Sequence, residues 1–200
     1  MKIGKRKSSH RGHRGRAQST RRKRRDLNAE TQRARRRRKR RAQARVPVPH
    51  VAIENRQRVV RVQLRPLEEF LKNVEGEIGL GPECVAVRLI GDAEMARLNG
   101  RYRKKKGPTD VLSFPVAADS AKPGTLRQQV RKARGGFLGD IAISPKVARR
   151  NAKSLGRQLP EELKVLILHG VLHLLGYDHE TDRGEMERIE MRLRRKLGIA

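Results

Sequence analysis

Three histidines lie in the eleven-residue stretch HGVLHLLGYDH near the C-terminal end of the 200-residue chain, at His169, His173 and His179. Residues four positions apart on a helix share one face, so the first two imidazoles can offer nitrogens to a single point. Gly176 breaks the helical pattern and lets the third histidine approach from the side. Three neutral imidazoles suit zinc and leave the fourth tetrahedral position for water, as in a catalytic site. We therefore expect one Zn²⁺ per chain, held by these three histidines.

The same histidine spacing occurs in the metzincin metalloproteases, in which a glutamate directly after the first histidine acts as general base. In this chain Gly170 occupies that position. A peptidase of that type would lack its proton acceptor, so the spacing supports the metal geometry and argues against protease chemistry. A glycine inside a helix costs roughly 1 kcal/mol relative to alanine, so Gly170 indicates a close approach by neighbouring backbone or by substrate.

The hydrophobic pattern predicts the helices that position these histidines. Pro160, followed by two glutamates, is typical of a helix start, and we expect the metal-binding helix to run over 163–175 until Gly176 ends it. A final helix is expected after Asp182 and Glu185, whose spacing is that of a capping box. Its expected apolar face comprises Met186, Ile189, Leu193 and Leu197.

The middle of the chain alternates predicted strands with predicted helices. Strands are expected at 51–54, 59–63, 84–90, 110–116 and 140–144, from their β-branched and apolar runs. Helices are expected at 67–74, after a cap at Asp92, and from Pro145. The segment 117–136 is rich in Gly, Ala, Lys and Arg and is interpreted as a mobile surface connection. This order predicts a single α+β domain in which a small mixed sheet packs against helices.

Positive charge is concentrated at the N-terminus. Residues 1–46 hold 21 Lys or Arg against only Asp26 and Glu30, so +19 of the formal net charge of +29 lies there. Such a segment cannot bury enough apolar surface to offset its ordering entropy, so we predict a disordered basic arm over 1–46. Pro47 and Pro49 mark the start of a domain that spans 47–200. The arm is interpreted either as an electrostatic contact for nucleic acid or as a dispensable leader.

Cysteine usage and hydropathy exclude two classes of protein. Cys84 is the only cysteine, so a disulfide framework is impossible and a reduced cytosol is the natural setting. The longest near-apolar run, 165–175, has eleven residues and contains two histidines, whereas a membrane helix needs about 20 apolar residues. We therefore expect a cytoplasmic protein that does not span a membrane.

Three separated motifs resemble one known family. HGVLHLLGYDH, preceded by LNGRYRKKKGPTDVLSFP (98–115) and LGDIAIS (138–144), resembles the bacterial YbeY family of rRNA maturation factors, which are single-strand-specific, metal-dependent endoribonucleases. The resemblance covers about residues 50–197 and not the arm. It implies that the three histidines are the zinc ligands, that Arg103 lies in the substrate cleft and is tied to activity, and that Asp140 is an acidic cleft residue. The basic run 104–106 departs from the family pattern.

The resemblance implies a zinc-dependent endoribonuclease that acts in rRNA processing, including maturation of the 3′ end of 16S rRNA, and in ribosome quality control. Ribosomal RNA, the small ribosomal subunit and its assembly factors are the implied partners. The chemistry is consistent with the residues, because zinc activates water and Arg103 can bind a phosphate with two hydrogen bonds. No separate general base is evident: either the zinc-bound hydroxide suffices, or Asp140 or Asp178 assists.

Two other functions are compatible with the same residues. One is an RNA-binding ribosome-assembly factor whose metal is mainly structural, which a cleavage assay with and without chelator would distinguish from a nuclease. The other is a hydrolase for another substrate, because a three-histidine zinc site does not by itself choose between amide and phosphate bonds. The basic charge favours phosphate.

The low aromatic content, 2%, leaves few platforms for stacking bases. Binding to RNA is therefore expected to depend on phosphate contacts and on salt. If the strand at 110–116 lies at the sheet edge beside the metal helix, Ser113 and the backbone around Pro115 line the substrate groove.

Overall fold

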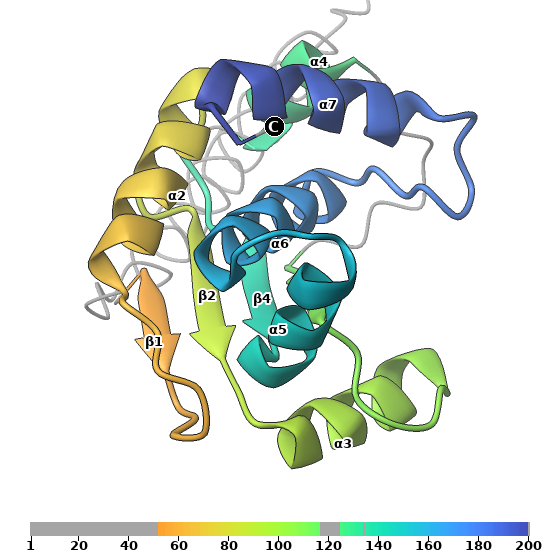
Figure 1. Cartoon of the computed structure of the whole chain (residues 1–200). Coiled ribbons are helices and arrows are strands. Elements are labelled where there is room, and N and C mark those ends of the chain that lie inside the picture. The colour runs from red at the N-terminus through yellow and green to blue at the C-terminus, as the bar shows by residue number, and fades with distance from the viewer. Residues whose placement is uncertain (1–51, 117–124, 134, 200) are drawn as a thin grey trace, which may run out of the picture. The chain divides into compact units, whose positions relative to one another are not determined.

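The computed structural model describes residues 52–116, 125–133 and 135–199. The predicted arm, residues 1–46, and Val51 lie outside the described residues. The elements, shown in Figure 1, are β1 (Ile53–Asn55), α2 (Arg65–Ile78), β2 (Val85–Leu89), α3 (Asp92–Arg103), β3 (Val111–Pro115), α4 (Leu126–Ala133), β4 (Gly139–Ile143), α5 (Pro145–Ser154), α6 (Leu159–Leu174) and α7 (Glu185–Leu197). In these described ranges, no helix combines the length and apolar character needed to cross a lipid bilayer.

The four strands form one mixed sheet in the order β1-β2-β4-β3. β1 pairs with β2 and β2 with β4 in parallel, whereas β3 runs antiparallel to β4. β3 therefore lies at an edge of the sheet, with Ser113 opposite Ile141 and Phe114 opposite Asp140. The predicted α+β class with a small mixed sheet is confirmed.

The two faces of the sheet are covered by different helices. Alternate residues of a strand point to opposite faces. Ile141 and Ile143 of β4 are fully buried in the main core, on the face over which α6 lies in Figure 1. Asp140 and Ala142 point to the other face, where Ala142 packs with Met95 of α3 in a second, smaller cluster. Successive side chains of β4 therefore lie alternately on the α6 side and on the α3 side of the sheet.

The helix α6, which carries His169 and His173, is apolar on almost all sides, and ten of its 16 residues are buried. Such a pattern is typical of a helix enclosed by its neighbours. Its end is fixed by Gly176, whose φ of 90° few other residues adopt. The N–H of Gly176 donates to His173 O at 2.9 Å, and the N–H of Tyr177 donates to Leu172 O at 3.1 Å. This pair of hydrogen bonds is a Schellman motif, so the predicted stop at Gly176 is confirmed.

The prediction of a strand at 59–63 is wrong. The side chain of Gln57 is buried, and its carbonyl oxygen accepts the N–H groups of Val59 at 2.9 Å and Val60 at 2.8 Å. Its amide donates to Val60 O at 2.8 Å. Because a side chain satisfies these backbone groups locally, the β-branched run does not need a strand partner.

The segment 117–136, interpreted as a mobile connection, contains the helix α4. Val130 is buried in the main core, and Leu126 and Ala133 pack against it. Their spacing of four and three places them on one face of the helix. The interpretation was wrong for this part because the three basic residues of α4 equal its three apolar ones in number and obscure the helical pattern. Residues 117–124 lie outside the described residues.

Asp92 does not cap α3 as expected, because the N-cap residue is Gly91. The Asp92 carboxylate instead accepts a hydrogen bond from Ser144 Oγ at 2.7 Å and pairs with Lys146 Nζ at 3.2 Å. These contacts hold the pKa of Asp92 below its usual value, chiefly through the Ser144 hydrogen bond. Ser144 is in turn the N-cap of α5, where its Oγ accepts the N–H of Val147. The carboxylate therefore connects the first turns of two helices.

Candidate metal centre

His169, His173 and His179 lie together at the end of α6, each with one ring nitrogen within 4.8 Å of the others. Nε2 of His169 and Nε2 of His173 are 3.1 Å apart. The ring centroid of His179 lies 5.2 Å from that of His169 and 5.3 Å from that of His173. An ion bound tetrahedrally at 2.0–2.1 Å would separate two nitrogens by about 3.4 Å. The donor set therefore fits a tetrahedral metal ion.

The charge state of His173 favours metal binding. Burial lowers the pKa of His173 to about 4, and the neighbouring His169 and His179 act in the same direction. The imidazole is therefore neutral near pH 7. A neutral imidazole keeps a lone pair for a metal ion, whereas a protonated one has none.

Glu190 of α7 orients His169. Its Oε2 lies 2.9 Å from His169 Nδ1, so this nitrogen can donate its proton to the carboxylate and leave Nε2 free on the side of the other histidines. The second oxygen, Oε1, accepts from Arg194 Nη2 at 2.5 Å. Burial raises the pKa of Glu190, but the contacts with His169 and Arg194 outweigh it and hold the pKa below its usual value. The carboxylate is therefore charged.

Gly170 allows α6 to approach the sheet closely. A Cβ atom on Gly170 would lie 2.8 Å from Cδ1 of Ile141 on β4, which is closer than real Cβ contacts. The carbonyl oxygen of Gly170 accepts a hydrogen bond from Ser113 Oγ of β3 at 3.2 Å. The glycine is thus explained by the Ile141 side chain, which packs directly on the helix backbone, and not by the neighbouring backbone or substrate that was expected.

A hollow of about 1110 Å³ extends in front of the three histidines. The edge strand β3 forms one wall, including Ser113 and Pro115, as expected for this strand. The end of α3, the segment after α6, and Glu190 and Arg194 of α7 form the rest. An edge strand presents unpaired backbone groups along its length. The hollow is therefore an open groove with polar backbone on one side and imidazoles on the other.

Arg103, the last residue of α3, lines this hollow. Its Nη2 donates to Glu180 Oε1 at 2.6 Å, and Lys105 Nζ lies 3.6 Å from the same oxygen. The contact with Arg103 is the main cause that holds the pKa of Glu180 below its usual value. Because Glu180 follows His179 directly, this ion pair brings the guanidinium to the rim of the histidine cluster.

The structure does not bring Asp140 to the histidines. Its side chain lies on the opposite face of the sheet from α6 and pairs with Arg88 Nη2 at 3.0 Å. Asp140 lines a different hollow, together with Phe114 and Tyr102. A catalytic role for Asp140 stays a prediction from the resemblance. Asp178 does line the histidine hollow, and its Oδ1 accepts the N–H of Glu180 at 3.1 Å.

Glu190 and Glu180 were not among the functional residues predicted from the sequence. Glu190 lies on the buried side of α7 with Met186 and Leu193, so an acid among the apolar positions of the final helix was a usable signal. Glu180 had no such signal, because its importance comes from an arginine 77 positions away in the chain.

Comparisons with known proteins point to one family. The sequence profile of the family described as endoribonuclease YbeY matches residues 52–198. The endoribonuclease YbeY of Solibacter usitatus is 44% identical over 133 residues, covering 66% of this chain and 78% of the relative. That of Koribacter versatilis is 42% identical over 144 residues, covering 72% and 84%. A Thermotoga maritima protein of known solution structure superposes with a TM-score of 0.48 at 26% identity, over 72% of this chain and 87% of that one.

Proposed function

This chain belongs to the YbeY family of endoribonucleases, and from that membership we propose that it cleaves single-stranded RNA internally with the help of zinc. Its proposed task is rRNA processing, including maturation of the 3′ end of 16S rRNA, and ribosome quality control. Ribosomal RNA and the small ribosomal subunit with its assembly factors are the proposed partners.

The observation that carries the proposal is the meeting of three imidazoles in a large open groove. Side chains that gather nitrogens within 4.8 Å fit a metal ion, and the groove leaves its open side to substrate. A volume of about 1110 Å³ exceeds that of most small-molecule pockets, which supports a polymeric substrate. Arg103 at the rim supplies positive charge for a phosphate.

The proposed metal ligands are His169, His173 and His179. When bound there, zinc lowers the pKa of water and polarises a phosphoryl oxygen. The residues of the chain prepare the site: Glu190 fixes the tautomer of His169, and burial keeps His173 neutral. Arg103 would exchange its contact with Glu180 for the scissile phosphate and offset charge that develops during cleavage.

The proposed division of the chain is a basic arm over 1–46 and a nuclease domain over 47–200. The family match to residues 52–198 supports the second part. The charge of +19 in the first part supports non-specific contact with RNA phosphates. We also propose a cytoplasmic location, which the single, buried cysteine supports.

Substrate selection tests the proposal directly. Purified protein loaded with zinc is incubated with matched single-stranded RNA, double-stranded RNA and single-stranded DNA, and each is repeated with a chelator. The proposal expects internal cleavage of the single-stranded RNA alone, abolished by the chelator and restored by added zinc. Cleavage that survives the chelator, or binding without any cleavage under all conditions, would refute it.

A further inference from the structure

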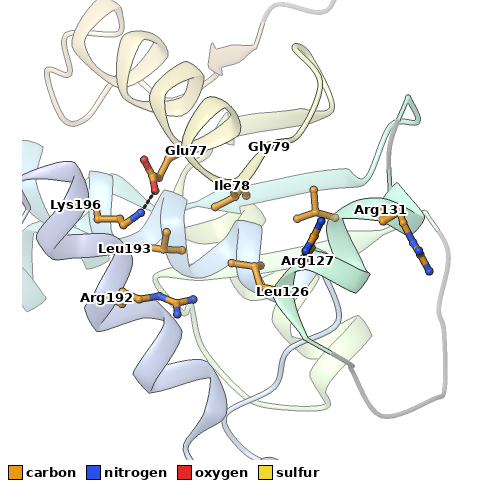
Figure 2. Close-up of a pocket in the computed structure, with 10 residues that line it drawn as sticks. Glu77, Ile78, Gly79, Leu126, Arg127, Arg131, Arg192, Leu193 and Lys196 are labelled. Atoms are coloured by element: carbon orange, nitrogen blue, oxygen red, sulfur yellow. Dashed lines mark hydrogen bonds and ion pairs between the residues drawn. The ribbon is translucent and has the colours of Figure 1, made fainter.

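A third hollow, of about 480 Å³, lies away from the histidines between the end of α2, α4 and α7. Figure 2 shows α4 and α7 on its two sides. Ile78, Leu126, Val130 and Leu193 form its apolar part. The main core continues beneath it, since Ile78, Val130 and Leu193 are buried. The floor of the hollow is therefore part of the packed core.

Four cationic residues of the described ranges line this hollow, and they come in two helical pairs. Arg127 and Arg131 are four residues apart on α4, and Arg192 and Lys196 are four residues apart on α7. Residues at this spacing share a helix face, so both helices present a basic row at the same opening. Two basic rows that line one hollow distinguish this surface from one on which basic residues are evenly spread.

The charges around the hollow are not balanced by acids. In the part of the chain that the structure describes, Glu77 is the one acidic residue that lines it, and its Oε1 pairs with Lys196 Nζ at 2.6 Å, the contact drawn in Figure 2. Among the residues that the structure describes, none forms an ion pair with Arg127, Arg131 or Arg192. Like charges held near one another repel, and a bound anion would relieve this repulsion.

The helix α7 connects this hollow with the metal centre. Glu190 and Arg194 line the histidine hollow, whereas Arg192 and Lys196 line the basic one. Positions two apart on a helix point to nearly opposite sides, so the two hollows flank a single helix. With side chains a helix is about 10–12 Å across, a span that a short stretch of extended RNA can cross.

We propose that this hollow, lined by Arg127, Arg131, Arg192 and Lys196, is a second RNA-binding site that holds phosphates of the strand whose neighbouring segment lies at the histidines. The inference rests on the proposed function and adds to it a substrate-holding site outside the metal centre. Guanidinium groups bind phosphate oxygens, and the apolar floor fits ribose or base. The site contributes to RNA affinity and takes no part in metal binding or bond cleavage.

The test compares the double variant Arg127→Gln/Arg192→Gln with a matched control, Arg149→Gln/Arg195→Gln. The control removes the same charge from exposed positions of α5 and α7 that line none of the hollows described above. Binding of a fluorescent single-stranded RNA, made uncleavable by 2′-O-methyl groups, is measured between about 50 and 200 mM salt. The full chain is used throughout, so the basic arm contributes equally to every variant.

Two lost phosphate contacts should reduce the slope of log K against log salt by about 1.4 and weaken binding about tenfold near 0.15 M salt. The control should keep the wild-type slope, and zinc content and turnover at saturating RNA should not change in either variant. An unchanged slope in the Arg127→Gln/Arg192→Gln variant, or an equal loss in the control, would overturn the inference.

The assay separates this inference from the proposed function because it follows binding without turnover. If the Arg127→Gln/Arg192→Gln variant shows a reduced slope but the wild-type protein cleaves no RNA, the second site is retained and the proposed nuclease function is refuted. If the wild-type protein cleaves RNA but the slope of the variant is unchanged, the nuclease function is retained and the second site is refuted. If instead a polyglutamate peptide, and not RNA, requires Arg127 and Arg192 for binding, the hollow takes an acidic protein segment and the RNA site is refuted.

Discussion

The Glu190 carboxylate lies 2.9 Å from Nδ1 of His169, with α7 supplying the acid and α6 the imidazole. The hydrogen bond directs the proton of His169 to Nδ1 and its lone pair to Nε2, which lies 3.1 Å from Nε2 of His173. Carboxylates that orient ligand histidines in this way are common in metal sites. The packing of α7 on α6 therefore contributes to the site as well as to the core.

Replacing this carboxylate should weaken metal binding. We expect Glu190→Gln to lower zinc affinity about 10–100-fold, because the amide holds no charge to stabilise the Nδ1 proton. A competition titration against a zinc chelator measures the change. Glu187→Gln, on the exposed side of the same helix, serves as control and should bind zinc as the wild type does. Equal affinity in the Glu190 and Glu187 variants would remove Glu190 from the site.

Arg103 should affect cleavage and not the metal. We expect Arg103→Ala to retain zinc and to lower single-turnover cleavage of RNA about 100-fold, the usual cost of losing one donor to a developing charge. Arg97→Ala, an exposed position on the same helix, should cleave normally. Unchanged cleavage by the Arg103 variant would show that its pairing with Glu180 is only a surface contact.

Asp140 offers a test of the resemblance against the geometry. Because its ion pair with Arg88 is partly exposed, we expect Asp140→Asn to cost no more than about 1 kcal/mol of stability. Zinc content and cleavage should stay close to wild type, since the side chain lies on the face of the sheet away from α6. Arg88→Gln breaks the same pair from the other side and should behave alike. Lost cleavage in the Asp140 variant alone would establish the catalytic role that the resemblance implies.

The single thiol should be unreactive in the folded protein. Burial raises the pKa of Cys84 to about 12, and Glu75, which accepts a hydrogen bond from its Sγ at 3.3 Å, acts in the same direction. The folded state thus keeps the proton between pH 9 and 12 while the unfolded state loses it, so the stability from this group is present below about pH 9 and is lost as pH rises toward 12.

Ellman's reagent at pH 8 measures this directly, because no other cysteine is present. We expect the native protein to react more than about 100-fold more slowly than the same protein in denaturant. Native and denatured rates that agree would mean that Cys84 is neither buried nor protonated as described.

Local patterns in the sequence were sufficient to predict α6, its stop at Gly176 and three of the four strands closely. Each depends on residues near one another in the chain. The order β1-β2-β4-β3 was not predictable, because it is set by packing between distant segments. The wrong prediction of a strand at 59–63 also results from a contact that the residue pattern does not show. The Gln57 side chain binds the backbone of the neighbouring valines, and this outweighs their strand preference.

Local spacing in the sequence was sufficient to predict the three histidines of the candidate site, but not the position of Asp140. His169 and His173 are one helical turn apart, and their approach to His179 follows from the turn at Gly176. The position of Asp140 could not be derived, because nothing in strand β4 says which face α6 will cover. Ile141 packs against Gly170 of α6, so the side chain of the neighbouring Asp140 points to the opposite face of the sheet.

Zinc content and RNA cleavage, measured together on the same preparations of wild type and His173→Ala, test the central claim most directly. The account predicts one zinc per wild-type chain, cleavage that is lost on chelation and regained with zinc, and loss of both metal and cleavage in the variant. Full zinc content in the variant, or undiminished cleavage by metal-free wild type, would contradict it.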